Sequence, residues 1–161
     1  MRTNFKILLF LVFTLSVVQS VAKKPQTVKY EILSAGSGVQ GTSLVKVWVY
    51  DKSGKVSDEE LKYGAVHGVI FRGFHGTQGM PSQSPIAKNV AVEQQKAEFF
   101  SAFFAENGPY LNFASIISES YERVRLAKKG YKVGAVISVN KTSLRKELEQ
   151  AGVIQSLSNG F

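Results

Sequence analysis

The chain has 161 residues, of which 44% are hydrophobic and 20% are charged, with a formal net charge of +8 and no cysteine. This composition is typical of a globular sequence and excludes the disordered, collagen-like and disulfide-stapled classes. Without cysteine, the chain also has no thiolate nucleophile, no cysteine-ligated metal site and no cysteine to carry a lipid anchor.

Residues 1–22 have the pattern of a secretory signal peptide. Arg2 and Lys6 precede an unbroken apolar run, and small residues precede an expected cleavage site after Ala22. The run is shorter than the roughly 20 residues of a stable membrane span, so we expect no transmembrane segment after cleavage. We expect residues 23–161 to form a single globular domain in the periplasm or outside the cell. A bacterial host is favoured because the exported chain lacks disulfides.

Basic residues are concentrated near the C-terminus. Residues 121–161 contain eight basic and three acidic side chains. A concentrated positive charge attracts acidic partners, and for an exported protein these are an acidic envelope protein, a glycan or an anionic lipid surface rather than nucleic acid. The alternative is a solvated face that only keeps the domain soluble.

The first half of the expected domain begins with two strands and a turn. Residues 28–32 alternate apolar and polar side chains, residues 34–41 suit a turn, and residues 43–50 form the strongest strand pattern in the chain. Val45, Val47 and Val49 share one face of that strand. The two strands are expected to pair as a hairpin.

A capping box predicts the start of the first helix, because Ser57 is followed three residues later by Glu60. The helix is expected to run to the end of the apolar pattern near residue 70. Gly64 and Gly68 lie four residues apart and indicate close packing of the backbone. His67 falls away from the apolar face, which predicts a histidine at the surface or its boundary with Glu60 as the only acidic residue at helical spacing.

A long loop containing glycine and proline occupies residues 73–89. Loops of this length are uncommon in compact domains and are often functional. At its start, Arg72, Phe74 and His75 combine a cation, an aromatic ring and a titratable group, so we predict that these three residues bind a ligand or partner.

Catalysis at this loop is the alternative interpretation. His75 is a weak candidate catalytic residue for a small hydrolase or transferase, and it would need a carboxylate from elsewhere, such as Glu93 or Glu119. The chain has only two histidines and none of the common hydrolase, nucleotide-binding or metalloprotease motifs. We therefore predict no cofactor, no metal site and no assigned catalytic residue.

The second half predicts a helix, three strands and a final helix. In order these are a helix over residues 90–107, strands over 110–117, 120–126 and 131–139, and a helix over 140–151. Four phenylalanines in the first of these helices are expected to lie in the core: Phe99, Phe100, Phe103 and Phe104. The order β-β-α-α-β-β-β-α predicts an α+β fold, with a mostly antiparallel sheet of about five strands and two or three helices on one face.

The hairpin predicted near the C-terminus carries a basic face. If Val124 and Leu126 share a face with the apolar residues of the next strand, Arg123, Arg125 and Lys132 point together to the other side. The leading interpretation is a non-enzymatic binding or assembly domain of the cell envelope that contacts an acidic partner or surface through these residues.

Overall fold

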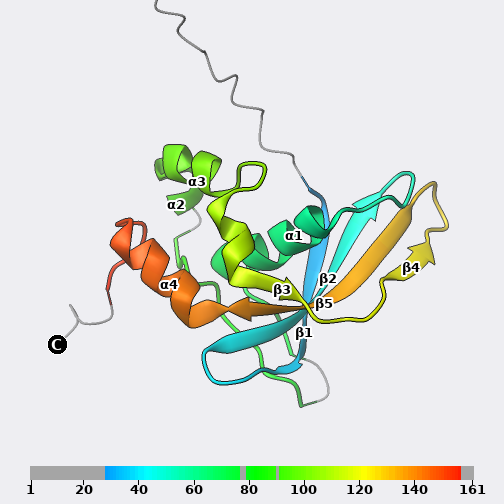
Figure 1. The fold of residues 1–161 in the computed structure, drawn as a ribbon, viewed down its shortest axis with the longest axis horizontal. Helices are drawn as coiled ribbons and strands as arrows, with labels where there is room; N and C mark the ends of the chain where they lie inside the picture. Colours follow the sequence, from blue (N-terminus) through cyan, green and yellow to red (C-terminus); the bar gives the residue numbers. More distant parts are fainter. Residues whose placement is uncertain (1–27, 77–78, 90, 157–161) are drawn as a thin grey trace, which may run out of the picture.

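The computed structural model describes residues 28–76, 79–89 and 91–156, so the predicted signal peptide over residues 1–22 lies outside the described residues. Within the described part, a five-stranded antiparallel sheet and four α-helices confirm the predicted α+β fold (Figure 1). The elements are β1 (Tyr30–Ser37), β2 (Thr42–Asp51), α1 (Asp58–Phe71), α2 (Val92–Gln95), α3 (Ala97–Phe103), the 3₁₀ helix η1 (Pro109–Phe113), β3 (Ala114–Ile116), β4 (Glu122–Arg125), β5 (Tyr131–Asn140) and α4 (Lys141–Gln150).

Strand β5 organises the sheet. The strand order is β1-β2-β5-β3, and β4 also pairs with β5. Along one edge β5 pairs with β2 over its whole length. Along the other edge, β4 pairs with the first part of β5 and β3 pairs with its last part. The chain leaves β5 directly into α4, so the β4–β5 turn and α4 lie at opposite ends of this strand (Figure 1).

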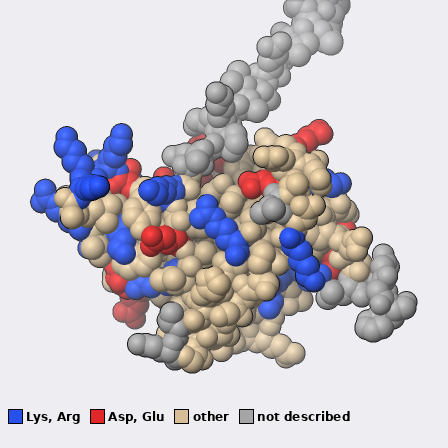
Figure 2. All heavy atoms as spheres, turned by 180° about the vertical axis from the view of Figure 1, so that it is seen from behind, with Lys and Arg blue, Asp and Glu red and all other residues tan. Residues whose placement is uncertain are grey.

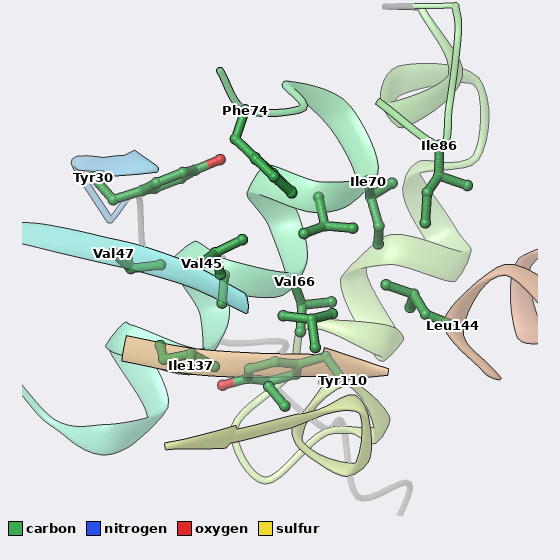
Figure 3. Close-up of a cluster of buried hydrophobic side chains, with 14 of the residues drawn as sticks. Tyr30, Val45, Val47, Val66, Ile70, Phe74, Ile86, Tyr110, Ile137 and Leu144 are labelled. Atoms are coloured by element: carbon green, nitrogen blue, oxygen red, sulfur yellow. The ribbon is translucent and has the colours of Figure 1, made fainter. Parts of the chain in front are cut away.

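One face of the sheet is buried beneath the helices. The residues predicted to share this face of β2 and β5 are at most 3% exposed, apart from Tyr131, which is half-buried: Val45, Val47, Val49, Val133, Ala135, Ile137 and Val139. The predicted capping box is present at the start of α1, where the Ser57 side chain accepts from the Glu60 amide and the Glu60 carboxylate accepts from Ser57. Buried residues of α1, α3 and α4 complete the core, as Figure 3 shows for Val66, Ile70 and Leu144.

Strand β1 is longer than the sequence pattern indicates. The segment predicted as a turn, residues 34–41, instead continues the strand to Ser37 and turns only afterwards. The pairing with β2 shifts between Ser34 and Gly36, and Gly36 has a φ of 119°. This irregularity absorbs an extra residue and lets pairing resume beyond it, which the alternation of side chains alone does not reveal.

The single helix predicted over residues 90–107 is two short helices. Lys96 leaves helical geometry between α2 and α3, with φ of −114° and ψ of 32°. Residues 94–96 carry no apolar side chain that could hold a continuous helix against the core. The predicted core role of the phenylalanines is confirmed, because Phe100 and Phe103 are buried and Phe99 and Phe104 pack against them.

The strand predicted over residues 110–117 is wrong in its first half. Pro109 begins the helix η1, and pairing with β5 starts only at Ala114. The preceding Asn107 has a φ of 56°, which turns the chain back toward the core. Tyr110 is buried, with Leu111 and Phe113 packed beside it, so their apolar character reflects core packing rather than strand alternation.

No helix among the described residues is long and apolar enough to cross a membrane.

Candidate functional site

The long loop is anchored to the core at both ends. Phe74 and Gln83 exchange two backbone hydrogen bonds of 2.9 Å. The amides of Ile86 and Ala87 then donate to carbonyl oxygens in the last part of α1. Phe74 and Ile86 point into the core together (Figure 3).

The structure does not bring together the three loop residues predicted to bind. The Arg72 guanidinium lies over the ring of Tyr30, 4.2 Å from its centroid, and donates to the Tyr30 carbonyl oxygen. The Phe74 side chain is buried. His75 is exposed, and its backbone oxygen accepts a bond from Ser34. Phe74 therefore supports the core, whereas Arg72, held against Tyr30, and His75 are both exposed to solvent.

A buried polar network surrounds the other histidine. His67 is 9% exposed and counts as buried, so the position predicted for it, at the surface or its boundary, is wrong. Its Nδ1 atom lies 2.7 Å from the Tyr30 hydroxyl, and its Nε2 atom lies 3.1 Å from a carboxylate oxygen of Glu93. The Tyr63 ring stacks on the imidazole at a centroid distance of 5.1 Å. No local pattern indicates this network, because its members come from β1, α1 and α2.

Burial sets the protonation states in this network. It lowers the pKa of His67, against the opposing effect of Glu93, so the imidazole is neutral. Burial also raises the pKa of Tyr30 above its usual range and that of Tyr63 to about 12. A neutral imidazole with its proton on Nε2 donates to Glu93 and accepts from the Tyr30 hydroxyl, which satisfies every group. Glu93, one of the carboxylates considered for His75, is thus bonded to His67.

The predicted basic face of the hairpin is not one face. Arg123 pairs with Val133 and Arg125 with Tyr131, which places both arginines on the helix side of the sheet. Lys132 pairs with Val124 on the opposite side. The turn closes with a bond from Leu126 to Gly130, and this closure sets a register one residue away from the one expected.

The three cations nevertheless lie at one end of the sheet, where the β2–α1 and β4–β5 turns are neighbours. Tyr131 pairs with both Asp51 and Arg125, and Arg123 donates to the carbonyl oxygen of Gly54 across the two turns at 2.6 Å. We call this region the basic end; it consists of Lys52, Lys55, Arg123, Arg125, Lys128, Lys129 and Lys132. Lysine and arginine side chains gather here, at the left of the view in Figure 2.

The acidic residue within the basic end stabilises a turn. Asp51 accepts from the amide and hydroxyl of Ser53 and from the amide of Lys55. The hydrogen bonds, led by that of the Ser53 side chain, lower the pKa of Asp51 to about 2. Its carboxylate remains charged at neutral pH but accepts hydrogen bonds within its own turn. It therefore forms no ion pair with the neighbouring lysine side chains of the described residues.

Lys132 has a second role on the open face of the sheet. Its Nζ atom lies 4.6 Å from the centroid of the Trp48 ring, and that of Lys46 lies 4.8 Å from the same ring. Lys46 also pairs with Glu122. The two lysine chains cover the indole, which is only 8% exposed, so Trp48 is not a free aromatic platform.

Comparison of the chain with family models, curated proteins and solved structures gave no match. Across residues 28–76, 79–89 and 91–156, no group of three or more histidine, aspartate or glutamate side chains is placed to hold a metal ion. The site must therefore be interpreted from its own geometry and charge.

Proposed function

We propose that the protein is an exported, non-enzymatic module that binds an anionic lipid surface of the cell envelope through its basic end. The observation that carries this proposal is the gathering of seven cationic side chains around two adjacent turns, where Asp51 is directed into its own turn. The signal-peptide pattern over residues 1–22 supports export.

The character of the turns favours lipid headgroups over a protein partner. Lys52, Lys128 and Lys129 are exposed, and none of them forms an ion pair with another described residue. The residues beside them, Ser53 and Ala127, are small. Five of the seven cations of the basic end are lysines, and lysines near a charged membrane contribute about 1 kcal/mol each without a defined contact.

Vesicle binding tests the proposal directly. The purified protein is sedimented with phosphatidylcholine vesicles and with vesicles that also contain phosphatidylglycerol. The test variant is Lys128→Gln/Lys129→Gln. The matched control, Lys88→Gln/Lys96→Gln, removes two exposed lysines outside the basic end.

We expect binding only to the anionic vesicles, weakened by salt and by about tenfold or more in the test variant. The control should bind like the unmodified protein. Equal loss in the two variants would show that only net charge matters and would overturn the proposal. Retention on an acidic polysaccharide without vesicle binding would also overturn it, in favour of a glycan.

A further inference from the structure

A cavity of about 530 Å³ lies between the long loop and α4. Residues Gln83 to Ile86 form one wall, and the first turns of α4 form the other. A second cavity of about 290 Å³ lies against the β1–β2 turn and shares Gln83 and Lys141 with the first. The larger volume falls within the range of small-molecule sites.

The wall formed by α4 is cationic. Lys141, Arg145 and Lys146 line the larger cavity, and Glu149 is the acidic residue among its lining residues. Glu149 accepts from Nε of Arg145 at 2.9 Å. This bond orients the guanidinium, and no other hydrogen bond to it is formed within the described part of the chain, so its two terminal nitrogens are available for the paired hydrogen bonds that a carboxylate or phosphate accepts.

The loop wall adds an apolar surface and an unsatisfied donor. Pro85 and Ile86 line the cavity, and the backbone N–H of Ile86 donates a hydrogen bond to the carbonyl oxygen of Val69. The Gln83 side chain accepts from the Ser43 hydroxyl at 2.8 Å, which orients its amide. The side-chain nitrogen Nε2 of Gln83 is buried and has no hydrogen-bond partner among the described residues. Such a donor is costly unless it finds an acceptor.

We propose that this cavity binds a small organic anion. Its phosphate or carboxylate group lies against Arg145 and the neighbouring lysines, and its uncharged body lies against Pro85 and Ile86. The Gln83 side chain lines the same cavity, so its amide resonances report on a ligand bound there. The site is separate from the basic end, because α4 begins at the far end of β5 from the β4–β5 turn.

The proposal can be tested by NMR titration of the isotope-labelled protein. The probes are phenyl phosphate and benzoate, with inorganic phosphate as the bare anion and benzyl alcohol as the uncharged ring. The resonances followed are the Gln83 side-chain amide and the backbone amides of Ser84 and Ile86. Arg145→Lys retains the charge without the planar pair of donors, Arg145→Gln removes both, and Arg125→Gln is the matched control at the basic end.

We expect saturable shifts at Gln83 and Ile86 with phenyl phosphate or benzoate, and the tighter of the two identifies the head group. Arg145→Lys should weaken binding by about tenfold, Arg145→Gln should weaken it further, and Arg125→Gln should leave it unchanged. Inorganic phosphate binding as tightly as both organic anions would overturn the proposal. Identical titrations of the Arg145→Gln variant and the unmodified protein would overturn it too. The Arg145→Gln variant should bind anionic vesicles like the unmodified protein, because vesicle binding tests the basic end alone. Failure of one proposal can therefore be distinguished from failure of the other.

Discussion

The Tyr30 hydroxyl lies 2.7 Å from Nδ1 of His67, and this bond joins β1 to α1 within the core. Glu93 occupies the other side of the imidazole at 3.1 Å, which ties in α2, a helix without buried residues of its own. The network therefore holds the segment after the long loop against α1. It is satisfied with a neutral histidine, because a protonated Nδ1 would no longer accept from Tyr30.

We expect stability to fall as the pH drops below about 6.5, the ordinary pKa of histidine. Burial lowers the pKa of His67 in the folded state, so below pH 6.5 the unfolded chain binds the proton more readily. The free energy of unfolding then decreases with falling pH by up to about 1.4 kcal/mol per pH unit, until the folded-state pKa is reached. Urea denaturation between about pH 5 and 7 measures this slope.

Matched variants separate His67 from other titrating groups. His67→Gln should be less stable at neutral pH and should lose most of the slope. His75→Gln, at the exposed histidine of the loop, should retain it. A slope of equal size in His67→Gln would show that another group causes the pH dependence.

The elements predicted correctly are those whose patterns are local. The capping box of α1, the alternation of β5 and the helix predicted over residues 140–151, which is α4, each involve residues close in sequence. The β4 register could not be predicted in this way, since a slip of one residue preserves the alternation and reverses the faces. The bulge near Gly36 depends on the pairing with Leu44 across the hairpin, and the packing of Tyr110 depends on Tyr63, far along the chain.

The candidate sites likewise divide into features visible in the sequence and features that depend on residues distant in the chain. The charge that forms the basic end is visible in the sequence, but the adjacency of the β2–α1 and β4–β5 turns requires the pairing of β2 with β5. The partners of His67 are 37 and 26 residues away, so helical spacing identified neither. The sequence analysis singled out the long loop as a candidate binding segment, but it did not identify the loop residues that line the two cavities, such as Gln83.

The two glycines of α1 should respond differently to alanine. A Cβ at position 64 would lie 2.8 Å from Val47 and 3.2 Å from the Tyr30 ring, both buried. One at position 68 would lie 2.7 Å from the terminal methyl of half-buried Ile32, 3.2 Å from its Cγ2 atom and 3.3 Å from the Tyr30 ring, and the closest of these atoms is the flexible end of a side chain. Overpacking costs about 1–3 kcal/mol and outweighs the gain of about 1 kcal/mol in helix propensity at position 64. Urea denaturation should show Gly64→Ala as clearly destabilised and Gly68→Ala as near neutral; the reverse order would contradict this packing.

Gly73→Ala should detach the loop from the core. Gly73 has a φ of 65°, and an added Cβ would lie 2.2 Å from the Gln83 carbonyl oxygen, a backbone atom that cannot move without breaking the Phe74 pairing. We expect faster hydrogen exchange at the amides of Phe74 and Gln83. Gly79→Ala, also at a positive φ (82°) but in open space, is the control and should leave those amides protected. Unchanged protection in Gly73→Ala would contradict the proposed anchoring.

Gly134→Ala should displace the only tryptophan in the chain. Trp48 lies directly across from Gly134 in the sheet, and a Cβ at that position would approach its ring to 2.6 Å. The ring cannot simply slide away, because Lys46 and Lys132 cover it. We expect red-shifted emission and stronger acrylamide quenching as the indole becomes exposed, with a stability loss of about 1–3 kcal/mol. Ser138→Ala, on the same face of β5 but opposite Leu44, should leave the emission unchanged, and an unshifted spectrum in Gly134→Ala would show that the ring has room to accommodate the methyl group.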